Sequence, residues 1–306
     1  MTKGSTVGAD DLAVLITGAR GQLGRALSTA AAAEQIRAEC RGSAELDITD
    51  ANAVDDAVAE LAAGGGRPVV INAAAYTAVD AAETDSAAAY AINATGAGHL
   101  AVAAARHNVG LIHVSTDYVF SGESTMPYRP PDPTGPRSVY GASKLAGEQA
   151  VQRAHPRAYV VRTSGVYGAT GSNFVKTIAR PESVHPNISV VNDQHVAPTF
   201  AADLASGLLE LAATEPQATG GILHATGGGG TTWYGFARAI FAELGAEPER
   251  VRPIGTDDYP LPARRPAYSL LSGQEWQQAG LTPLRDWRQA LAAAFAYHGP
   301  QFRHIS

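Results

Sequence analysis

The sequence contains a single cysteine, Cys40, and no long run of apolar residues. One cysteine cannot form an intrachain disulfide or a cysteine-rich zinc site, and such usage is typical of a reducing compartment, so we expect a cytoplasmic location. No segment approaches the roughly 20 uninterrupted apolar residues that a membrane-spanning helix requires. Residues 1–10 are polar and lack the apolar core of a signal peptide. We expect them to form a flexible N-terminal extension.

Charged residues are also scarce. Only 17% of the 306 residues are charged, and the net charge is -6. This balance gives no general attraction to nucleic acid or to an anionic membrane. None of the nine histidines shows metal-ligand spacing, so no metal is expected. With 45% hydrophobic residues, the chain is long enough for a large domain accompanied by a smaller one.

Lysine is the rarest charged residue, with only Lys3, Lys144 and Lys176 in the chain. One of the three stands four residues after a tyrosine, in the stretch VYGASKLAGE. Two side chains at this spacing can simply pack together on a surface helix. Because lysine is so rare here, the pair Tyr140 and Lys144 favours a chemical reason.

Short apolar runs alternate with alanine-rich helical stretches over the first half of the chain. Continuous apolar runs predict strands that are buried on both faces, as in a parallel sheet. Strand and helix in alternation predict a doubly wound α/β fold of the Rossmann type. We expect strands at 12–17, 36–40, 69–74, 109–115 and 158–164, and helices at 22–33, 52–63 and 87–106.

After about residue 170 the pattern becomes mixed, with helical stretches between short strands and proline-rich turns. We expect helices within 172–179, 200–213, 231–244 and 284–298. The sequence therefore predicts a dinucleotide-binding domain of residues 11–170 that also receives 190–215. Residues 171–189 and 216–306 are expected to form a smaller mixed α/β substrate-binding region.

The first predicted strand leads directly into the glycine-rich stretch TGARGQLG. Its glycines Gly18, Gly21 and Gly24 stand between a strand and a helix, which is the context that a dinucleotide site requires. Such a turn lets backbone N–H groups approach a pyrophosphate at the helix N-terminus. The alternative is a tight turn without a ligand.

The residue that selects the cofactor is expected near the second strand. Glu39 could accept a hydrogen bond from a ribose 2'-hydroxyl, which favours NAD, while Arg41 could neutralise a 2'-phosphate, which favours NADP. The sequence leaves this choice open. Asp47 and Ile48 lie where an adenine amino group could be recognised, although Asp47 could instead cap the next helix.

Two further segments, NAAAYTAVD (72–80) and VSTDYVFSG (114–122), follow predicted parallel strands. Ligands bind outside the carboxyl ends of strands in open α/β sheets, so both segments are expected at the same edge as the glycine turn. The alternative for Ser115 to Asp117 is a local turn that its own side chains stabilise.

Together these segments resemble the extended short-chain dehydrogenase/reductase superfamily and, within it, the dTDP-4-dehydrorhamnose reductase family. The matching segments span nearly the whole chain and include RTSGVYG, NFVKTI, VVNDQHVAPT, GGTTWYGFA and ARRPAYSLL as well as those quoted above. The resemblance implies an oxidoreductase that uses NADPH, with NADH as the alternative, to reduce the 4-keto group of dTDP-4-dehydro-β-L-rhamnose. The product, dTDP-L-rhamnose, serves cell-surface polysaccharide.

The resemblance also implies roles for individual residues. Tyr140 would protonate the substrate carbonyl oxygen, and Thr116 would donate to the same oxygen. Lys144 would bond to the nicotinamide ribose and lower the pKa of the phenol. The cofactor would contact Gly18, Gly21, Gln22, Leu23, Gly24, Asp47, Ile48, Ala73, Ala74, Ala75, Thr77, Tyr140 and Lys144. The substrate would contact Thr116, Asp117, Tyr118, Val79, Asp80 and Arg265.

Some positions depart from the family or separate it from its neighbours. Related dehydratases carry an acidic pair after the threonine, whereas Asp117 is followed here by Tyr118, which favours simple reduction. Gly165 stands where well-known members have a tryptophan over the sugar. Ala26 and Ala202 stand near glutamates that hold magnesium at a dimer interface in some members. We therefore expect no metal, and a monomer or a homodimer.

The sequence leaves two alternative functions open. A branch similar to these reductases serves as the regulatory subunit of methionine adenosyltransferase and holds NADP without turnover. The complete set of Thr116, Tyr140 and Lys144 argues against that role. The other alternative is a reductase for another nucleotide-linked 4-keto-6-deoxy sugar.

Overall fold

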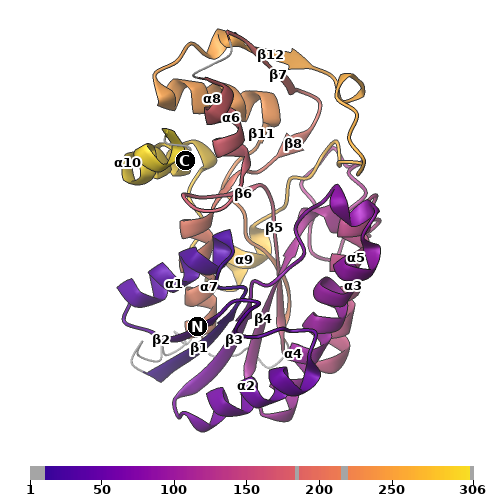
Figure 1. Ribbon diagram of the computed structural model, residues 1–306, viewed down its shortest axis with the longest axis vertical. Coiled ribbons are helices and arrows are strands. Elements are labelled where there is room, and N and C mark those ends of the chain that lie inside the picture. Colours follow the sequence, from indigo (N-terminus) through magenta and orange to yellow (C-terminus); the bar gives the residue numbers. More distant parts are fainter. Residues whose placement is uncertain (1–10, 183–185, 215–219, 304–306) are drawn as a thin grey trace.

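The computed structural model describes residues 11–182, 186–214 and 220–303. Its centre is a parallel six-stranded sheet with the strand order β10-β5-β4-β3-β1-β2 (Figure 1). The expected doubly wound Rossmann-type fold is confirmed, because strand order reverses beside β1 and helices cover both faces. The strands are β1 (Leu12–Thr17), β2 (Arg37–Arg41), β3 (Arg67–Asn72), β4 (Gly110–Thr116), β5 (Tyr159–Thr163) and β10 (Gly221–His224).

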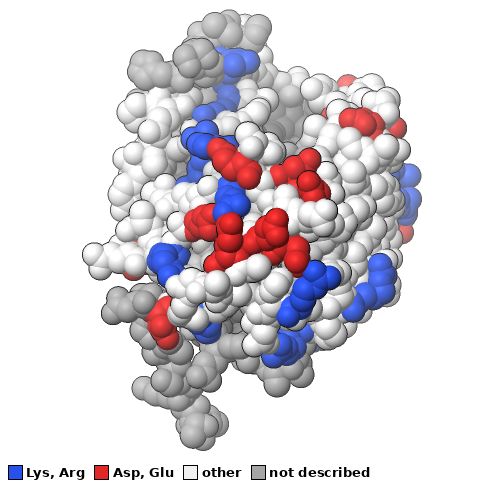
Figure 2. Space-filling model, turned by 60° about the horizontal axis from the view of Figure 1, so that its bottom comes forward, with Lys and Arg blue, Asp and Glu red and all other residues white. Residues whose placement is uncertain are grey.

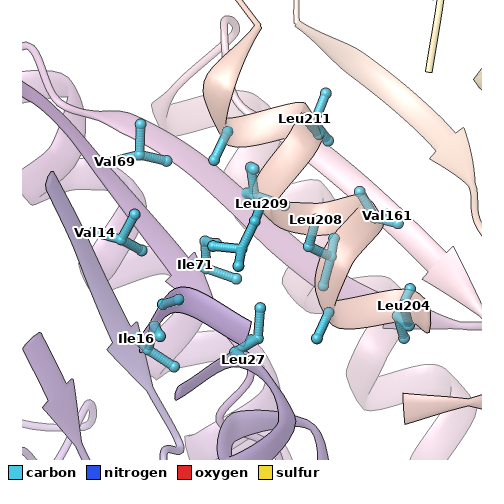
Figure 3. Packing of buried hydrophobic residues seen from close by; sticks show 14 of the residues in the cluster. Val14, Ile16, Leu27, Val69, Ile71, Val161, Leu204, Leu208, Leu209 and Leu211 are labelled. Atoms are coloured by element: carbon cyan, nitrogen blue, oxygen red, sulfur yellow. The ribbon is translucent and has the colours of Figure 1, made fainter. Parts of the chain in front are cut away.

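Helices α1 (Gln22–Ala33) and α7 (Ala201–Ala213) pack on one face of this sheet. Figure 3 shows Val14, Ile16 and Ile71 of the strands facing leucines of these two helices. On the other face, a second apolar cluster joins α2 (Ala51–Ala63), α4 (Ala97–Arg106) and α5 (Val139–Ala154) to the sheet. Both faces of the sheet are therefore dry, as its continuous apolar runs predict.

The predicted helix at 87–106 is not continuous. It consists of α3 (Ser86–Tyr90), a π-helical segment (Ala91–Gly96) and α4. Asn93 of the π-helical segment accepts from the backbone N–H of Tyr76 at 2.8 Å and donates to the hydroxyl of Ser143 at 2.9 Å. The irregular turn thus aims one amide at both the loop after β3 and helix α5, two elements of the site described below.

The C-terminal part is built differently, from three two-stranded sheets and an aromatic cluster. Tyr167, Phe200, Phe236 and Trp287 pack together there, with Tyr167 and Phe236 ring centroids 5.4 Å apart. The sheets pair β6 (Val166–Tyr167) with β9 (Thr199–Phe200), β7 (Ile188–Val191) with β12 (Val251–Ile254), and β8 (His195–Val196) with β11 (Thr231–Thr232). The helices of the C-terminal half are α6 (Phe174–Glu182), α8 (Trp233–Leu244), α9 (Gln274–Gln278) and α10 (Trp287–Arg303). Short 3-10 turns occur in both halves of the chain, at Ala81–Glu83, Asp117–Val119, Pro248–Arg250 and Thr256–Asp258.

One strand lies on the other side of the predicted division. Residues 216–306 were expected in the substrate-binding region, but β10 pairs with β5 as the edge strand of the main sheet. Its four residues form too short an apolar run to be recognised from the sequence. Helix α9 also packs its Trp276 into the cluster on the α1 and α7 face. The chain therefore returns to the first domain more than once after residue 190.

The face drawn in Figure 2 carries both positive and negative side chains, and acidic and basic groups lie beside one another on it. Among the described residues, no helix is both long enough and apolar enough to pass through a bilayer. No group of three or more potential metal-binding side chains occurs in the described parts of the chain either.

Candidate active site

A cavity of about 810 Å³ lies along the carboxyl ends of β1, β3, β4 and β5. The glycine turn, the loop after β3, the end of β4 and helix α5 all contribute to its wall. Of the residues proposed from the sequence, the cavity is lined by Gly18, Gly21, Gln22, Leu23, Asp47, Ile48, Ala73, Ala74, Ala75, Thr77, Val79, Thr116, Asp117, Tyr118, Tyr140 and Lys144. Gly24, Asp80 and Arg265 do not line it.

The glycine turn has the geometry that a pyrophosphate site needs. Gly18 adopts a φ of +67°, and a Cβ there would lie 2.6 Å from the backbone nitrogen of Ala74. A Cβ on Gly24 would lie 2.2 Å from the carbonyl oxygen of Gly18, so this glycine allows α1 to pack closely on the turn. Gly21, the N-cap of α1, brings no side chain over the helix end. The helix N-terminus thus faces the cavity with small residues around it, which fits a dinucleotide.

Asp47 and Ile48 line the cavity beyond this turn. The carboxylate of Asp47 accepts from the backbone N–H of Thr49 at 2.9 Å and from its hydroxyl at 2.8 Å. Asp50, not Asp47, is the N-cap of α2. The helix-cap alternative for Asp47 is therefore wrong, and Asp47 instead holds its own loop against the cavity.

Tyr140 and Lys144 lie one turn apart on α5, which begins at the N-cap Ser138. The hydroxyl of Ser138 accepts from the N–H of Gly141 at 3.1 Å. Lys144 is 2% exposed, and its ammonium group donates to the carbonyl oxygen of Val114 at 2.7 Å. Burial lowers the pKa of Lys144 to about 8, although the nearby carboxylate of Glu148 opposes this shift.

The phenol of Tyr140 is less acidic than the resemblance implies. Burial raises the pKa of Tyr140 to about 12, while a hydrogen bond with Thr116 acts in the opposite direction. The charge of Asp117 adds to the rise. In this structure the pKa of Tyr140 is therefore raised, and the lowering by Lys144 that the resemblance implies stays a prediction. The same hydrogen bond places the phenol and the Thr116 hydroxyl together.

Thr116 and Asp117 are held by a small buried network. The Thr116 hydroxyl donates to Asp117 at 2.9 Å, and the Ser164 hydroxyl donates to the other carboxylate oxygen at 2.8 Å. Burial raises the pKa of Asp117, and hydrogen bonds from Ser269, Ser164 and Thr116 oppose that rise. The local turn weighed for Ser115 to Asp117 does exist, because Thr116 Oγ1 also accepts from the N–H of Tyr118 at 3.2 Å. It coexists with the cavity rather than replacing it.

Asp80 and Arg265 form an ion pair instead of lining the cavity. The guanidinium of Arg265 donates to both carboxylate oxygens of Asp80, at 2.6 Å for the Nη2 to Oδ2 bond. Hydrogen bonding to Asp80, together with contact with Tyr118, raises the pKa of Arg265. The loop after β3 and the segment ARRPAYSLL are therefore tied together beside Tyr118. Tyr118 packs edge-on against Tyr140, with ring centroids 5.6 Å apart.

The cofactor-selecting positions considered from the sequence do not reach the cavity. Arg41 donates to Glu39 at 2.5 Å and to Glu60 at 2.8 Å, and neither Glu39 nor Arg41 lines the wall. Arg20 and Ser43 line it instead. Arg20 stands inside the glycine motif itself, so its position could have been noticed from the sequence. Ser43 lies in a loop whose course the sequence does not reveal.

Further wall residues lie at the end of β5 and in the segments that follow it, and of these only Gly165 was considered from the sequence. They are Thr163, Ser164, Gly165, Val166, Gly171 and Ser172. Gly165 has a φ of +56°, and a Cβ there would lie 2.9 Å from a methyl group of Val196. A large side chain at this position would therefore require both the backbone and its neighbour to move.

Behind Lys144 lies a fully buried ion pair. Arg162 of β5 donates to both oxygens of Glu148 at 2.9 and 2.7 Å, and Ser115 donates to the same carboxylate at 2.5 Å. Arg162 and Glu148 are 2% and 1% exposed. His113, also buried, lies 3.5 Å from the Lys144 ammonium, and burial lowers its pKa well below the usual value. No local pattern in the sequence connects these residues.

Comparison with known proteins agrees with this geometry. The family described as RmlD substrate binding domain matches residues 12–298. The chain is 51% identical to a dTDP-4-dehydrorhamnose reductase of Mycobacterium tuberculosis over 288 residues, which are 92% of each chain. It is 47% identical to a probable dTDP-4,6-dihydroxy-2-methyloxan-3-one 4-ketoreductase of Streptomyces antibioticus, over 92% of this chain and 94% of the relative.

A solved structure gives the same result. The crystal structure of the dTDP-4-dehydrorhamnose reductase of Bacillus anthracis in complex with NADP superposes with a TM-score of 0.87 at 36% identity. The match covers 94% of this chain and 99% of that one. The chain therefore belongs to the RmlD substrate-binding-domain family, the family of the dTDP-4-dehydrorhamnose reductases.

Proposed function

We propose that this protein reduces the 4-keto group of dTDP-4-dehydro-β-L-rhamnose to give dTDP-L-rhamnose, with NADPH as the reductant. The observation that carries the proposal is the meeting of Tyr140, Lys144 and Thr116 in one cavity wall with the glycine turn. A phenol and a hydroxyl near a dinucleotide site are suited to deliver a proton to a ketone. The relatives named above act on nucleotide-linked sugars, which supports the substrate class.

NADPH would be held by the glycine turn and by the residues of the loop after β3. When bound, it supplies the hydride for the carbonyl carbon. The phenol of Tyr140 then gives its proton to the carbonyl oxygen, so that the ketone gains one hydride and one proton and becomes a secondary alcohol. The hydroxyl of Thr116 would donate to the same oxygen as negative charge develops on it.

Lys144 would assist by its charge. A cation one helical turn from the phenol would favour the phenolate and so oppose the rise in the pKa of Tyr140 that burial causes. The ammonium now donates to Val114, a single neutral acceptor that can be exchanged for another hydroxyl or carbonyl oxygen. We infer that Lys144 is a binding residue for the ribose and an electrostatic aid to Tyr140.

Arg20 is our candidate for the preference for NADPH over NADH. It lines the cavity at the glycine turn and carries a mostly exposed guanidinium, paired only at the surface with Glu45. Arginine matches the geometry of a phosphate group well, and Ser43 nearby offers a hydroxyl. Arg41 is a weaker candidate because two carboxylates already engage it.

For the molecule as a whole, we propose that the main sheet with its helices binds the cofactor and the C-terminal part binds the sugar nucleotide. The ion pair between Asp80 and Arg265 supports this division, since it joins the two parts beside Tyr118. The single, exposed Cys40 supports a reducing, cytoplasmic location. We propose a monomer or a homodimer that acts without a metal.

The test is a panel of nucleotide-linked 4-keto sugars assayed with NADPH and with NADH. Purified protein should oxidise NADPH only when a keto sugar is present, fastest with dTDP-4-dehydro-L-rhamnose, and the product should be dTDP-L-rhamnose. NADPH binding without oxidation in the presence of any keto sugar would refute the proposal and favour a cofactor-binding regulatory role.

A second candidate substrate is another dTDP-linked 4-keto-6-deoxy sugar. The relative from Streptomyces antibioticus, whose name describes a different 4-keto sugar, favours keeping it in the panel. Gly165 also leaves the wall near the sugar without a side chain. A higher kcat/KM for a sugar other than the rhamnose precursor would assign the protein to that substrate instead.

A further inference from the structure

One buried hydroxyl in the cavity wall has no hydrogen-bond partner. Thr163, the last residue of β5, is 6% exposed, and its Oγ1 atom is buried without a donor or acceptor within reach. Thr163 is also one of the residues that line the cavity. Its hydroxyl is therefore shielded from bulk solvent but borders the space where a ligand would lie.

The other buried threonines of the described residues are paired. Thr199 is fully buried, and its hydroxyl donates to Ala197 at 3.1 Å and accepts from the N–H of Gly227 at 3.0 Å. Thr17 of β1 donates to Asn72 at 2.7 Å. A buried hydroxyl without a partner lowers stability, so such a group in a native protein needs an explanation, such as a functional role or a bound water or ion. Thr163 is the exception that calls for a ligand.

Its place in the sheet shows which end of the cavity it serves. Thr163 is the register partner of Thr116 on the neighbouring strand β4. Side chains alternate along a strand, so Thr163 points to the same face as Val161, which packs in the cluster of α1 and α7. Tyr140 hydrogen-bonds the side chain of Thr116, so the proposed proton donor lies beside the register partner of Thr163. The reacting ring of a dinucleotide must lie beside Tyr140, near Thr163.

We propose that the Thr163 hydroxyl hydrogen-bonds the carboxamide of the nicotinamide ring and so fixes the ring's orientation. The proposal rests on the function proposed above. An amide offers both an acceptor oxygen and N–H donors, and a hydroxyl can pair with either. The hydroxyl of the neighbouring Ser164 already donates to Asp117, whereas that of Thr163 has both its donor and its acceptor capacity free. Thr163 is thus a binding and positioning residue that takes no part in proton transfer.

The test replaces Thr163 with valine, which keeps the shape and removes the hydroxyl. Thr199→Val is the matched control, because it removes a buried hydroxyl that is already paired. Two readouts are needed, the Tm of the ligand-free protein and the Kd measured by calorimetry. The ligands are NADPH and adenosine 2',5'-bisphosphate, which lacks the nicotinamide.

We expect ligand-free Thr163→Val to melt at the same temperature as the wild type or higher, whereas Thr199→Val should melt lower. Thr163→Val should bind NADPH roughly three- to tenfold more weakly, which is the net effect of one hydrogen bond. Its affinity for adenosine 2',5'-bisphosphate should be unchanged. The kcat of Thr163→Val should also be lower, because the nicotinamide ring is no longer held in its orientation.

Three results would overturn the proposal. Unchanged NADPH affinity with a lowered Tm would give Thr163 a structural role only. An equal loss of affinity for adenosine 2',5'-bisphosphate would place the contact elsewhere on the cofactor, and a change confined to the KM of the keto sugar would assign the hydroxyl to the substrate. Failure of the wild type to bind NADPH would instead refute the proposed function, so the two failures are distinguishable.

Discussion

The interior of the central sheet and its carboxyl edge contrast sharply, although the same strands build both. Residues 12–16 of β1 are all apolar and buried, and the next residue is Thr17. In β3 the buried apolar residues are followed by the polar Asn72, and in β5 they are followed by Arg162 and Thr163. Each strand thus changes character within one or two residues, and it does so on the side where the cavity lies.

The apolar interior of the sheet contributes stability, whereas its polar carboxyl edge holds the groups for catalysis. The interior is a pair of apolar clusters, whose burial drives folding and makes no demand on orientation. At the edge, buried polar groups satisfy one another in networks around Lys144, Asp117 and Glu148, which fixes their orientation. Substitutions in the interior should therefore change stability without changing catalysis, and substitutions at the edge should change catalysis.

The largest effect on stability is expected from Arg162→Met. It removes one partner of a buried ion pair and leaves the Glu148 carboxylate uncompensated, which should lower the free energy of unfolding by about 3 to 5 kcal/mol. Denaturant unfolding at neutral pH measures this. The double variant Arg162→Met with Glu148→Gln should recover part of the loss. If the double variant is less stable than the single one, the pair is not the source of the effect.

Leu15→Ala tests the interior. Leu15 is fully buried in the cluster between the sheet and α2, away from the cavity wall, so its truncation should lower the free energy of unfolding by about 3 kcal/mol. The folded fraction should keep its NADPH affinity and kcat. A loss of turnover beyond the loss of folded protein would contradict the separation of the two zones.

A pH-dependent effect of comparable or smaller size is expected at Lys144. Burial holds its pKa at about 8, compared with an ordinary value of 10.5, so the unfolded chain binds more protons than the folded one between these pH values. The ligand-free wild type should therefore gain up to about 3 kcal/mol from Lys144 as the pH rises through this window. The stability difference between the wild type and Lys144→Met, measured at pH 7.5 and 10, should shift by that order in favour of the wild type. A difference independent of pH would show that the buried lysine is not desolvated as described.

The smallest effect is expected at the exposed end of the cavity. Arg20→Ala should lower the ratio of kcat/KM for NADPH to that for NADH by roughly tenfold, because one charged contact to the 2'-phosphate is lost. Arg41→Ala is the matched control and should change this ratio little. If Arg41→Ala lowered the ratio and Arg20→Ala left it unchanged, the residue that selects NADPH would be Arg41 on β2.

The regular elements could be predicted from the sequence, since they rest on local patterns. The strand at 12–17 and the helix at 22–33 have the predicted bounds, and the other strands of the first half differ by no more than two residues. The glycine turn and the Tyr140 to Lys144 spacing are also local, so both could be assigned before the fold was known. A short strand such as β10 carries too little periodicity for this, and only its pairing with β5 defines it.

The contacts between distant segments could not be predicted in the same way. The pairing of Arg162 with Glu148 and of Arg265 with Asp80 depends on which strand and helix become neighbours. The direction of the Lys144 ammonium toward Val114 depends on the local geometry of β4. The unpaired hydroxyl of Thr163 is visible only when all its neighbours are in place.

The central claim is that the phenol of Tyr140 protonates the substrate carbonyl. Single-turnover oxidation of NADPH by dTDP-4-dehydro-L-rhamnose, measured for the wild type and for Tyr140→Phe, tests it most directly. We expect the rate to fall at least roughly 100-fold while the Kd for NADPH stays within about twofold. A Tyr140→Phe variant that turns over at the rate of the wild type would show that the phenol is not the proton donor.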